Sequence, residues 1–284
     1  MGSSQAPYPF SHVDAHPDPR RLIDTLYGLR SEAFYVSYKQ RLLELLRAGP
    51  GQRFLDVGAG TGDAAGKLCS TTGAEVVACD LAKVMCAEMR KNGLRHVAVA
   101  DVQRLPFRDA AFDGAWADRV LQHVEDPGRA LGEMVRVVRP GGRIVVFDPD
   151  SGTQALNIED HRLAARVLSL RQTVSLRHST VARRVPGILT ALGLQEIQVE
   201  TRTLLVRDRK TVDRVMSIRG WADTFADLGH LERAEARRFN TLLDDAIRRG
   251  TFLYSVTYFL TSATVTVTGH REDRDTGGLR SANG

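Results

Sequence analysis

The segment RFLDVGAGTGD, residues 53–63, brings an acidic side chain and three glycines together directly after an apolar run. Alternate glycines let the backbone pass close to a bound ligand, and their position indicates a loop between a strand and a helix. A dinucleotide-binding loop would have glycine at position 63, where this chain has Asp63, and a P-loop would end in Gly-Lys-Ser/Thr. The carboxylate of Asp56 repels a phosphate and suits a cation, so the segment predicts a positively charged ligand.

Further acidic residues follow the next apolar runs of the chain. Asp80 ends the run EVVACD, Asp101 follows HVAVA, and the segment FDGAWADRVLQHVEDPGRALGEMVRVVRPGGRIVVFD occupies residues 112–148. In their order and spacing over residues 50–150, these segments resemble the motifs of class I S-adenosylmethionine-dependent methyltransferases. The last segment is similar to the ubiquinone/menaquinone-methyltransferase-like branch, also called type 11.

The resemblance implies S-adenosylmethionine as the cofactor. In the family, the acid at the position of Asp56 interacts with the methionine ammonium, that of Asp80 accepts hydrogen bonds from both ribose hydroxyls, and that of Asp101 accepts one from the adenine amino group. The cofactor-binding residues that the resemblance implies are Asp56, Gly58, Gly60, Thr61, Gly62, Asp80, Leu81, Met85, Asp101, Val102, Asp118 and Arg119.

His123 is the candidate catalytic residue. Methyl transfer from a sulfonium is a displacement at an activated carbon, so a base is needed only where the acceptor must lose a proton. His123 follows the predicted fourth strand, beside the transferable methyl group in this architecture, and is the best candidate for that base. The alternative is a histidine that packs or hydrogen-bonds to the backbone.

Candidates for acceptor binding come from the predicted helices and from the end of the fifth strand. They are Tyr27, Tyr35, Asp148, His178 and Trp221. The alternatives are core packing for the aromatic residues, helix capping or turn formation for Asp148, and a solvated or capping position for His178. Four arginines between residues 162 and 177 predict a solvated face with Glu159 and Asp160, the alternative being an acidic substrate or a phosphate. No metal site is predicted, because the three cysteines match no zinc or redox spacing.

The elements that must position these residues are visible as an alternation of apolar runs and helical patterns. Strands predicted at FLDVG, EVVACD, HVAVAD, FDGAWAD and RIVVFD alternate with helices, which indicates a parallel sheet covered on both faces. The second half predicts helices at 155–184 and 210–249 and strands at 194–206 and 252–267. The fold class is therefore α/β, a doubly wound, mostly parallel seven-stranded sheet of the Rossmann-like methyltransferase type, with helical insertions forming a lid.

The predicted organisation has four parts. Residues 1–48 form an N-terminal helical cap whose first 19 residues are expected to be mobile, and 49–150 form the S-adenosylmethionine-binding core. Residues 151–268 complete the sheet and carry the substrate-cap insertions, and 269–284 form a disordered tail.

The composition of the chain restricts the classes of partner that are expected. No apolar run approaches the roughly 20 residues of a membrane helix, so a cytoplasmic protein without a membrane partner is expected. The net charge of +5 accompanies no nucleic-acid-binding motif, so a small-molecule acceptor and no nucleic acid are predicted, in a monomer or homodimer. Only five of 39 basic residues are lysine, which suggests a GC-rich bacterial source.

The function favoured by these features is methyl transfer to carbon or oxygen, less so nitrogen, of a hydrophobic acceptor in bacterial secondary metabolism, such as natural-product or antibiotic biosynthesis. A quinone-pathway C-methyltransferase is the first alternative. The second is an S-adenosylmethionine-binding protein with a non-methylating or nucleic-acid-modifying role.

Overall fold

A seven-stranded sheet forms the centre of the protein in the computed structural model, which describes residues 9–30, 32–213 and 217–266. The strands are β1 (Arg53–Val57), β2 (Glu75–Asp80), β3 (His96–Val99), β4 (Phe112–Asp118), β5 (Val138–Asn157), β6 (Gln195–Val206) and β7 (Leu253–Thr264). Their order is β3-β2-β1-β4-β5-β7-β6, and only β7 runs antiparallel to its neighbours. The predicted fold class, a mostly parallel seven-stranded sheet, is confirmed.

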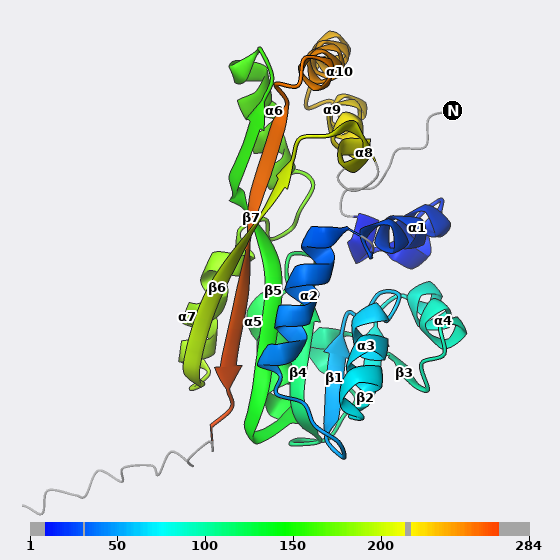
Figure 1. The fold of residues 1–284 in the computed structure, drawn as a ribbon, viewed down its shortest axis with the longest axis vertical. Coiled ribbons are helices and arrows are strands. Elements are labelled where there is room, and N and C mark those ends of the chain that lie inside the picture. Colours follow the sequence, from blue (N-terminus) through cyan, green and yellow to red (C-terminus); the bar gives the residue numbers. More distant parts are fainter. Residues whose placement is uncertain (1–8, 31, 214–216, 267–284) are drawn as a thin grey trace, which may run out of the picture.

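Helices cover both faces of the sheet and extend beyond one of its edges (Figure 1). They are α1 (Pro19–Leu29), α2 (Ala33–Leu45), α3 (Asp63–Thr72), α4 (Lys83–Lys91), α5 (Pro127–Val137), α6 (His161–Thr173), α7 (Val185–Ala191), α8 (Arg209–Thr211), α9 (Ile218–Asp227) and α10 (Arg233–Arg248). Helices α6, α9 and α10 pack together at the top of Figure 1, beside the upper end of β7. We call these three helices the helical cap; they are separate from the N-terminal helical cap predicted at residues 1–48.

Side chains of the central strands alternate between two hydrophobic cores. On β1, Phe54 packs on the face covered by α2 and α3, whereas Leu55 and Val57 pack on the face covered by α5 and α7. This alternation follows from the two-residue period of a strand. Because both faces are covered, the central strands are apolar on both sides, and they expose only their carboxyl ends to a ligand.

The helices predicted in the second half differ from those observed. The helix predicted at 155–184 begins only at His161, because β5 continues to Asn157 and its end pairs with β7, Leu156 opposite Tyr254. The helix predicted at 210–249 is divided among α8, α9 and α10. The predicted domain boundary at residue 150 falls inside β5, so one sheet spans both halves. The predicted tail, 269–284, lies outside the described residues.

The first described residues are ordered against the rest of the protein. Pro9–Ser11 and Val13–Ala15 form two short 3-10 helices, so the expectation that residues 1–19 are mobile is wrong for this part. Val13 is buried among apolar side chains that include Leu22 and Met85. We call residues 9–16 the N-terminal strap. Within the described part of the chain, no helix is long and apolar enough to span a bilayer.

Candidate functional site

A cavity of about 620 Å³ lies at the carboxyl edge of the sheet, where β1, β2 and β4 end. Parallel strands bring their carboxyl ends to one edge, so residues far apart in the sequence meet there. The predicted cofactor-binding residues that line the cavity are Asp56, Gly58, Gly60, Thr61, Asp80, Leu81, Met85, Asp101, Val102, Asp118 and Arg119. Gly62 does not line it.

The glycine loop after β1 needs glycine for two different reasons. At Gly58, φ is +64° and an added Cβ would lie 2.5 Å from a methyl group of Val120, so a side chain would push against a cavity-lining residue. At Gly62, φ is +78° and a Cβ would lie 2.3 Å from Leu94. Gly62 therefore serves the packing at the start of α3, which explains why it lies outside the cavity wall.

Asp56 is a buried carboxylate with an unused oxygen. It is 2 % exposed, and its Oδ2 has no hydrogen-bond partner among the described residues. Burial raises the pKa of Asp56 well above its usual range, and repulsion from Asp118 and Asp63 adds to this. A positively charged group in the cavity would favour the ionised carboxylate and occupy the free oxygen.

Asp80, at the end of β2, links the glycine loop to the start of α4. Its Oδ2 accepts a hydrogen bond from the backbone N–H of Gly60 at 3.0 Å, and its Oδ1 accepts one from Ala82 at 2.9 Å. Each carboxylate oxygen has a second lone pair, so Asp80 can also accept hydrogen bonds from a diol in the cavity. Asp101 is similarly held by the N–H of Gln103 at 2.9 Å.

Asp118 and Arg119 form a polar cluster with α2 at the end of β4. The hydroxyl of Tyr38 donates to Asp118 at 3.0 Å, and the guanidinium of Arg119 lies 3.2 Å from the same carboxylate. Arg119 has a φ of 61°, a strained conformation for a residue other than glycine. Its guanidinium also lies over the ring of Tyr35, 5.0 Å from the centroid. Asp118, Arg119 and Tyr35 all line the cavity.

His123 lines the cavity, as predicted, but in a form that makes it a weak base. Its Nδ1 is buried without a partner among the described residues. Burial lowers the pKa of His123 to about 3, and the positive charges of Arg171 and Arg119 contribute. The imidazole is therefore neutral at neutral pH, and it can accept a hydrogen bond more readily than a proton.

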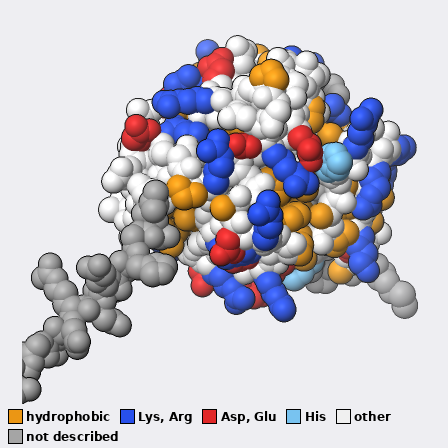
Figure 2. Space-filling model, turned by 90° about the horizontal axis from the view of Figure 1, so that it is seen from below, with side chains coloured by type: hydrophobic (Ala, Val, Ile, Leu, Met, Phe, Trp, Pro, Cys, Tyr) orange, Lys and Arg blue, Asp and Glu red, His pale blue; other side chains and the backbone are white. Residues whose placement is uncertain are grey.

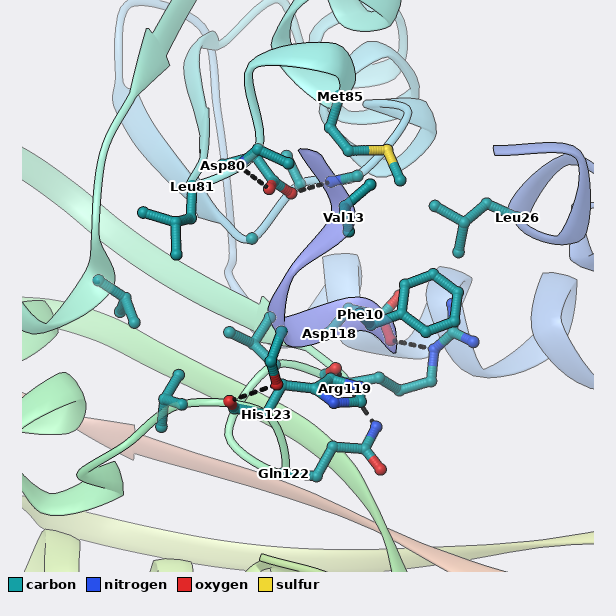
Figure 3. A pocket seen from close by; sticks show the side chains of 18 of the residues that line it. Phe10, Val13, Leu26, Asp80, Leu81, Met85, Asp118, Arg119, Gln122 and His123 are labelled. Carbon is teal, nitrogen blue, oxygen red and sulfur yellow. Dashed lines mark hydrogen bonds and ion pairs between the residues drawn. The ribbon is translucent and has the colours of Figure 1, made fainter. Parts of the chain in front are cut away.

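The N-terminal strap crosses the cavity (Figure 3). Its Phe10 lies against His123, with the ring centroids 5.9 Å apart, and the hydroxyl of Ser11 donates to the carbonyl oxygen of His123 at 2.9 Å. Asp14 accepts from the backbone N–H groups of Lys83 and Val84 at 2.8 and 3.1 Å, which caps the start of α4. Sequence reasoning missed the strap, because a stretch rich in Pro, Ser and His has no apolar period.

Among the aromatic residues predicted to bind the acceptor, only Tyr35 lines the cavity. Tyr27 turns away and donates its hydroxyl to Glu88 on α4 at 2.5 Å, so its predicted role is corrected. Trp221 is buried behind the wall, where its ring lies under the guanidinium of Arg171, 4.9 Å from the centroid, and supports that side chain.

Asp148 and His178 also lie outside the wall. Asp148 is fully buried and accepts from the backbone N–H groups of Leu121 and Gln122, at 3.3 and 3.4 Å, which holds the loop that carries His123. The ring of His178 lies 3.0 Å from the carbonyl oxygen of Glu125. Both predictions are corrected, because each side chain is occupied by the backbone and orders the loop after β4.

The cavity is also lined by five residues that were not predicted, namely Ser151, Gln154, Arg171, Tyr254 and Tyr258. Arg171 was assigned to a solvated face, although it follows the buried residues Leu163 and Val167 at a spacing of four on α6. That spacing places all three on one helix face and was the available signal. Within the described part of the chain, no group of three or more His, Cys, Asp or Glu is placed to hold a metal.

Comparison with known proteins matches residues 55–146 to a family model described as a methyltransferase domain. An uncharacterized 37.1 kDa protein in transposon TN4556 of Streptomyces fradiae is 29 % identical, over 81 % of this chain and 67 % of its own length. Demethylmenaquinone methyltransferase of Beutenbergia cavernae is 42 % identical, over 39 % of this chain. The match spans 46 % of that enzyme's length, or about half.

Solved structures share the fold. The crystal structure of the [4+2]-cyclase SpnF superposes with a TM-score of 0.52 and 20 % sequence identity, covering 93 % of this chain and all of that one. At this level of identity the likeness concerns the arrangement of the sheet and helices alone.

Proposed function

Because the chain carries a class I, type 11 S-adenosylmethionine-dependent methyltransferase domain, we propose that it methylates a hydrophobic small molecule at carbon or oxygen. Nitrogen is the less favoured acceptor atom. We also propose a role in bacterial secondary metabolism, such as natural-product or antibiotic biosynthesis. The likeness to a Streptomyces protein and the predominance of arginine over lysine favour this setting.

The cavity residues fit the cofactor of this family. The unpartnered oxygen of Asp56 suits the methionine ammonium, and Asp80 has lone pairs left for the ribose hydroxyls. The exposed side chain of Leu81 and the loop of Asp101 and Val102 offer an apolar and a polar contact for the adenine. When bound, S-adenosylmethionine supplies a methyl group on an activated sulfonium.

The chain's own contribution to the reaction is orientation and exclusion of water. The strap and Arg171 of α6 contribute to the cavity wall, and the cluster of Tyr38, Asp118 and Arg119 holds the loop after β4 in place. Well-oriented reactants gain much of their rate from proximity alone. In this proposal, His123 accepts a hydrogen bond from an acceptor hydroxyl, which orients the acceptor and lowers the cost of its deprotonation.

The single observation that carries the proposal is the continuity of one cavity. The same space is lined at one end by Asp56 and Asp80 and at the other by Tyr35, Tyr254 and Tyr258, which come from α2 and β7. A cavity of this size with aromatic residues in its wall suits a compact acceptor. On the face that Figure 2 shows, basic side chains are dispersed among acidic and apolar ones, so this face offers no continuous basic surface for a nucleic acid.

Labelled methyl transfer tests the proposal. The protein is incubated with methyl-labelled S-adenosylmethionine and a panel of phenols, aromatic acids, naphthoquinols and an oligonucleotide. Label in a phenol or aromatic acid supports it, and Asp80→Ala should lower the rate. Label in the oligonucleotide alone, or failure of S-adenosylhomocysteine to bind, overturns it.

One specific observation supports each of two other functions. The identity to a demethylmenaquinone methyltransferase favours a quinone-pathway C-methyltransferase, which predicts label on the naphthoquinol and on no other member of the panel. The [4+2]-cyclase is named for a reaction other than methyl transfer on the same fold, so the second alternative is an S-adenosylmethionine-binding protein that does not transfer the methyl group. In that case an acceptor is consumed while the label stays on the cofactor.

A further inference from the structure

Arg171 is a half-buried cation at the acceptor end of the cavity. It projects from α6 into the wall, and the described residues provide its guanidinium with neither a carboxylate nor a hydrogen-bond acceptor. The ring of Trp221, 4.9 Å from the guanidinium carbon, supports one face of the group. An aromatic face attracts the charge but satisfies none of the five N–H donors of an arginine. The donors are therefore available to a ligand.

The groups that face Arg171 do not neutralise it. From the loop after β4 come His123, which is neutral, and Arg119, whose charge is matched by Asp118. From β7 come Tyr254 and Tyr258, and burial raises the pKa of both phenols, so they are uncharged as well. Burial lowers the pKa of Arg171 itself, which is the cost of a cation held away from water without a counter-ion.

Four residues that line the same cavity each carry a buried polar atom without a partner in the described part of the chain. Ser151 Oγ, Gln154 Oε1, Tyr254 OH and His123 Nδ1 are buried, and none has a hydrogen-bond partner among the described residues. All four residues line the cavity. Buried polar groups in folded proteins are nearly always hydrogen-bonded, and a cluster of exceptions calls for a ligand or ordered water that supplies the partners.

The path of β5 explains why Ser151 and Gln154 are available. The pairing of β5 with β7 is interrupted between Asp150 and Ala155, so the residues between them leave the ladder at the cavity edge. Gln172, the neighbour of Arg171 on α6, donates to the carbonyl oxygen of Ser151 at 2.9 Å and fixes the two segments together. β-Bulges next to a site commonly redirect side chains toward it.

We propose that the acceptor carries a carboxylate, which the Arg171 guanidinium binds through two parallel hydrogen bonds, with the hydroxyls of Tyr254 and Ser151 as further donors. A planar carboxylate matches the fork of a guanidinium better than a single charged point would. Gln154 Oε1 is left to accept a hydrogen bond from a hydroxyl or amine of the same molecule. The inference rests on the proposed function and specifies its substrate class as an aromatic or otherwise hydrophobic acid.

A carboxylate at this position would also change His123. The low pKa of this imidazole is caused by burial and by the two arginines, and an anion between them offsets their field. His123 would then be a stronger base when the acceptor is bound than when the cavity holds only solvent. Recognition of the acid and activation of the acceptor are thereby linked through Arg171.

Paired ligands that differ only in charge test the proposal. Binding of 4-hydroxybenzoate and of 4-hydroxybenzamide is measured by calorimetry, with and without saturating S-adenosylhomocysteine. We expect wild type to bind the acid about tenfold or more tightly than the amide. Arg171→Gln should abolish the preference, and Arg171→Lys should retain part of it. Tyr254→Phe should weaken the binding of the acid and leave the binding of the amide unchanged. Arg162→Gln, an exposed arginine of the same helix, is the matched control and should change nothing.

The outcomes separate this proposal from the proposed function. Equal binding of acid and amide, no binding of the acid, or a preference that survives Arg171→Gln overturns the carboxylate site while S-adenosylhomocysteine still binds. Tighter binding of phenyl phosphate than of 4-hydroxybenzoate replaces the carboxylate by a phosphate and also overturns it. Failure of S-adenosylhomocysteine to bind wild type overturns the proposed function instead. Unchanged S-adenosylhomocysteine affinity and melting temperature in Arg171→Gln establish that the variant is folded.

Discussion

At the scale of single residues, Asp80 connects the loop geometry to cofactor affinity. Asp80→Ala removes the acceptor for the Gly60 and Ala82 N–H groups and for the ribose hydroxyls, leaving donors unpaired. We expect S-adenosylmethionine binding to weaken by about 1.5–3 kcal/mol, measured by calorimetry. Asp113→Ala is the control, because Asp113 also accepts from a backbone N–H, that of Arg53, but does not line the cavity. Unchanged affinity in Asp80→Ala would remove Asp80 from the site.

His123 carries a prediction about pH. The pKa of His123 is lowered to about 3 in the folded protein, so between about pH 3 and the ordinary value near 6.5 the unfolded chain binds the additional proton. Stability therefore falls as pH decreases below about 6.5, and His123→Asn should reduce this fall. Urea unfolding at pH 7.5 and 5.0 measures both slopes. Equal slopes in wild type and variant would contradict the burial of a neutral imidazole.

The same histidine separates two forms of catalysis. If its pKa stays low with cofactor and acceptor bound, the turnover rate should show no acid limb near pH 6–7. If the acceptor's carboxylate raises the pKa, such a limb should be present, and His123→Asn should remove it and lower turnover by about a hundredfold. A pH profile of turnover in both proteins distinguishes these cases.

At the scale of elements, two glycines at the start of α3 are expected to respond in opposite ways to substitution by alanine. Gly62→Ala forces a left-handed φ on alanine and drives its Cβ to 2.3 Å from Leu94, so it should destabilise the fold by about 1–3 kcal/mol. Gly66→Ala, inside α3 with no atom within 4 Å of the new Cβ, should stabilise by about 0.5–1 kcal/mol. Denaturant midpoints of the two variants measure the contrast. A shift of the same sign in both would contradict the packing role of Gly62.

At the scale of the whole molecule, the cavity joins three parts of the chain. The strap, the carboxyl edge of the sheet and the helical cap all contribute to its wall, so a ligand inside it bridges them. S-adenosylhomocysteine retains every cofactor contact except those to the sulfonium charge, and at a hundred times its Kd it should add about 2.7 kcal/mol of stability. Thermal unfolding with S-adenosylhomocysteine, and with NAD as control, measures this. Stabilisation by NAD instead would indicate a dinucleotide site.

The features of the fold that depend on local sequence patterns were predictable from the sequence. The apolar runs of the central strands, the glycine loop after β1 and the acids Asp56, Asp80 and Asp101 at the strand ends depend on two-residue periodicity and chain order. A parallel sheet then brings those ends to one edge without further information. The sheet class followed from these properties, whereas the residues that line the cavity at the strand ends were those that the resemblance to class I methyltransferases implied.

The burial of individual side chains and the residues that they contact were decided only by the tertiary structure. Whether Arg171 is solvated or faces a cavity depends on how α6 packs against β5 and β7, and no local pattern states which neighbours arrive there. The same holds for the strap, which is ordered by contacts with α4 and with His123. The charge state of His123 is likewise a property of its surroundings, because desolvation and two arginines distant in sequence set its pKa. The residues at the strand ends, which we propose bind the cofactor, follow from the order of the sequence. Those of the proposed acceptor site depend on long-range packing, which sequence order does not specify.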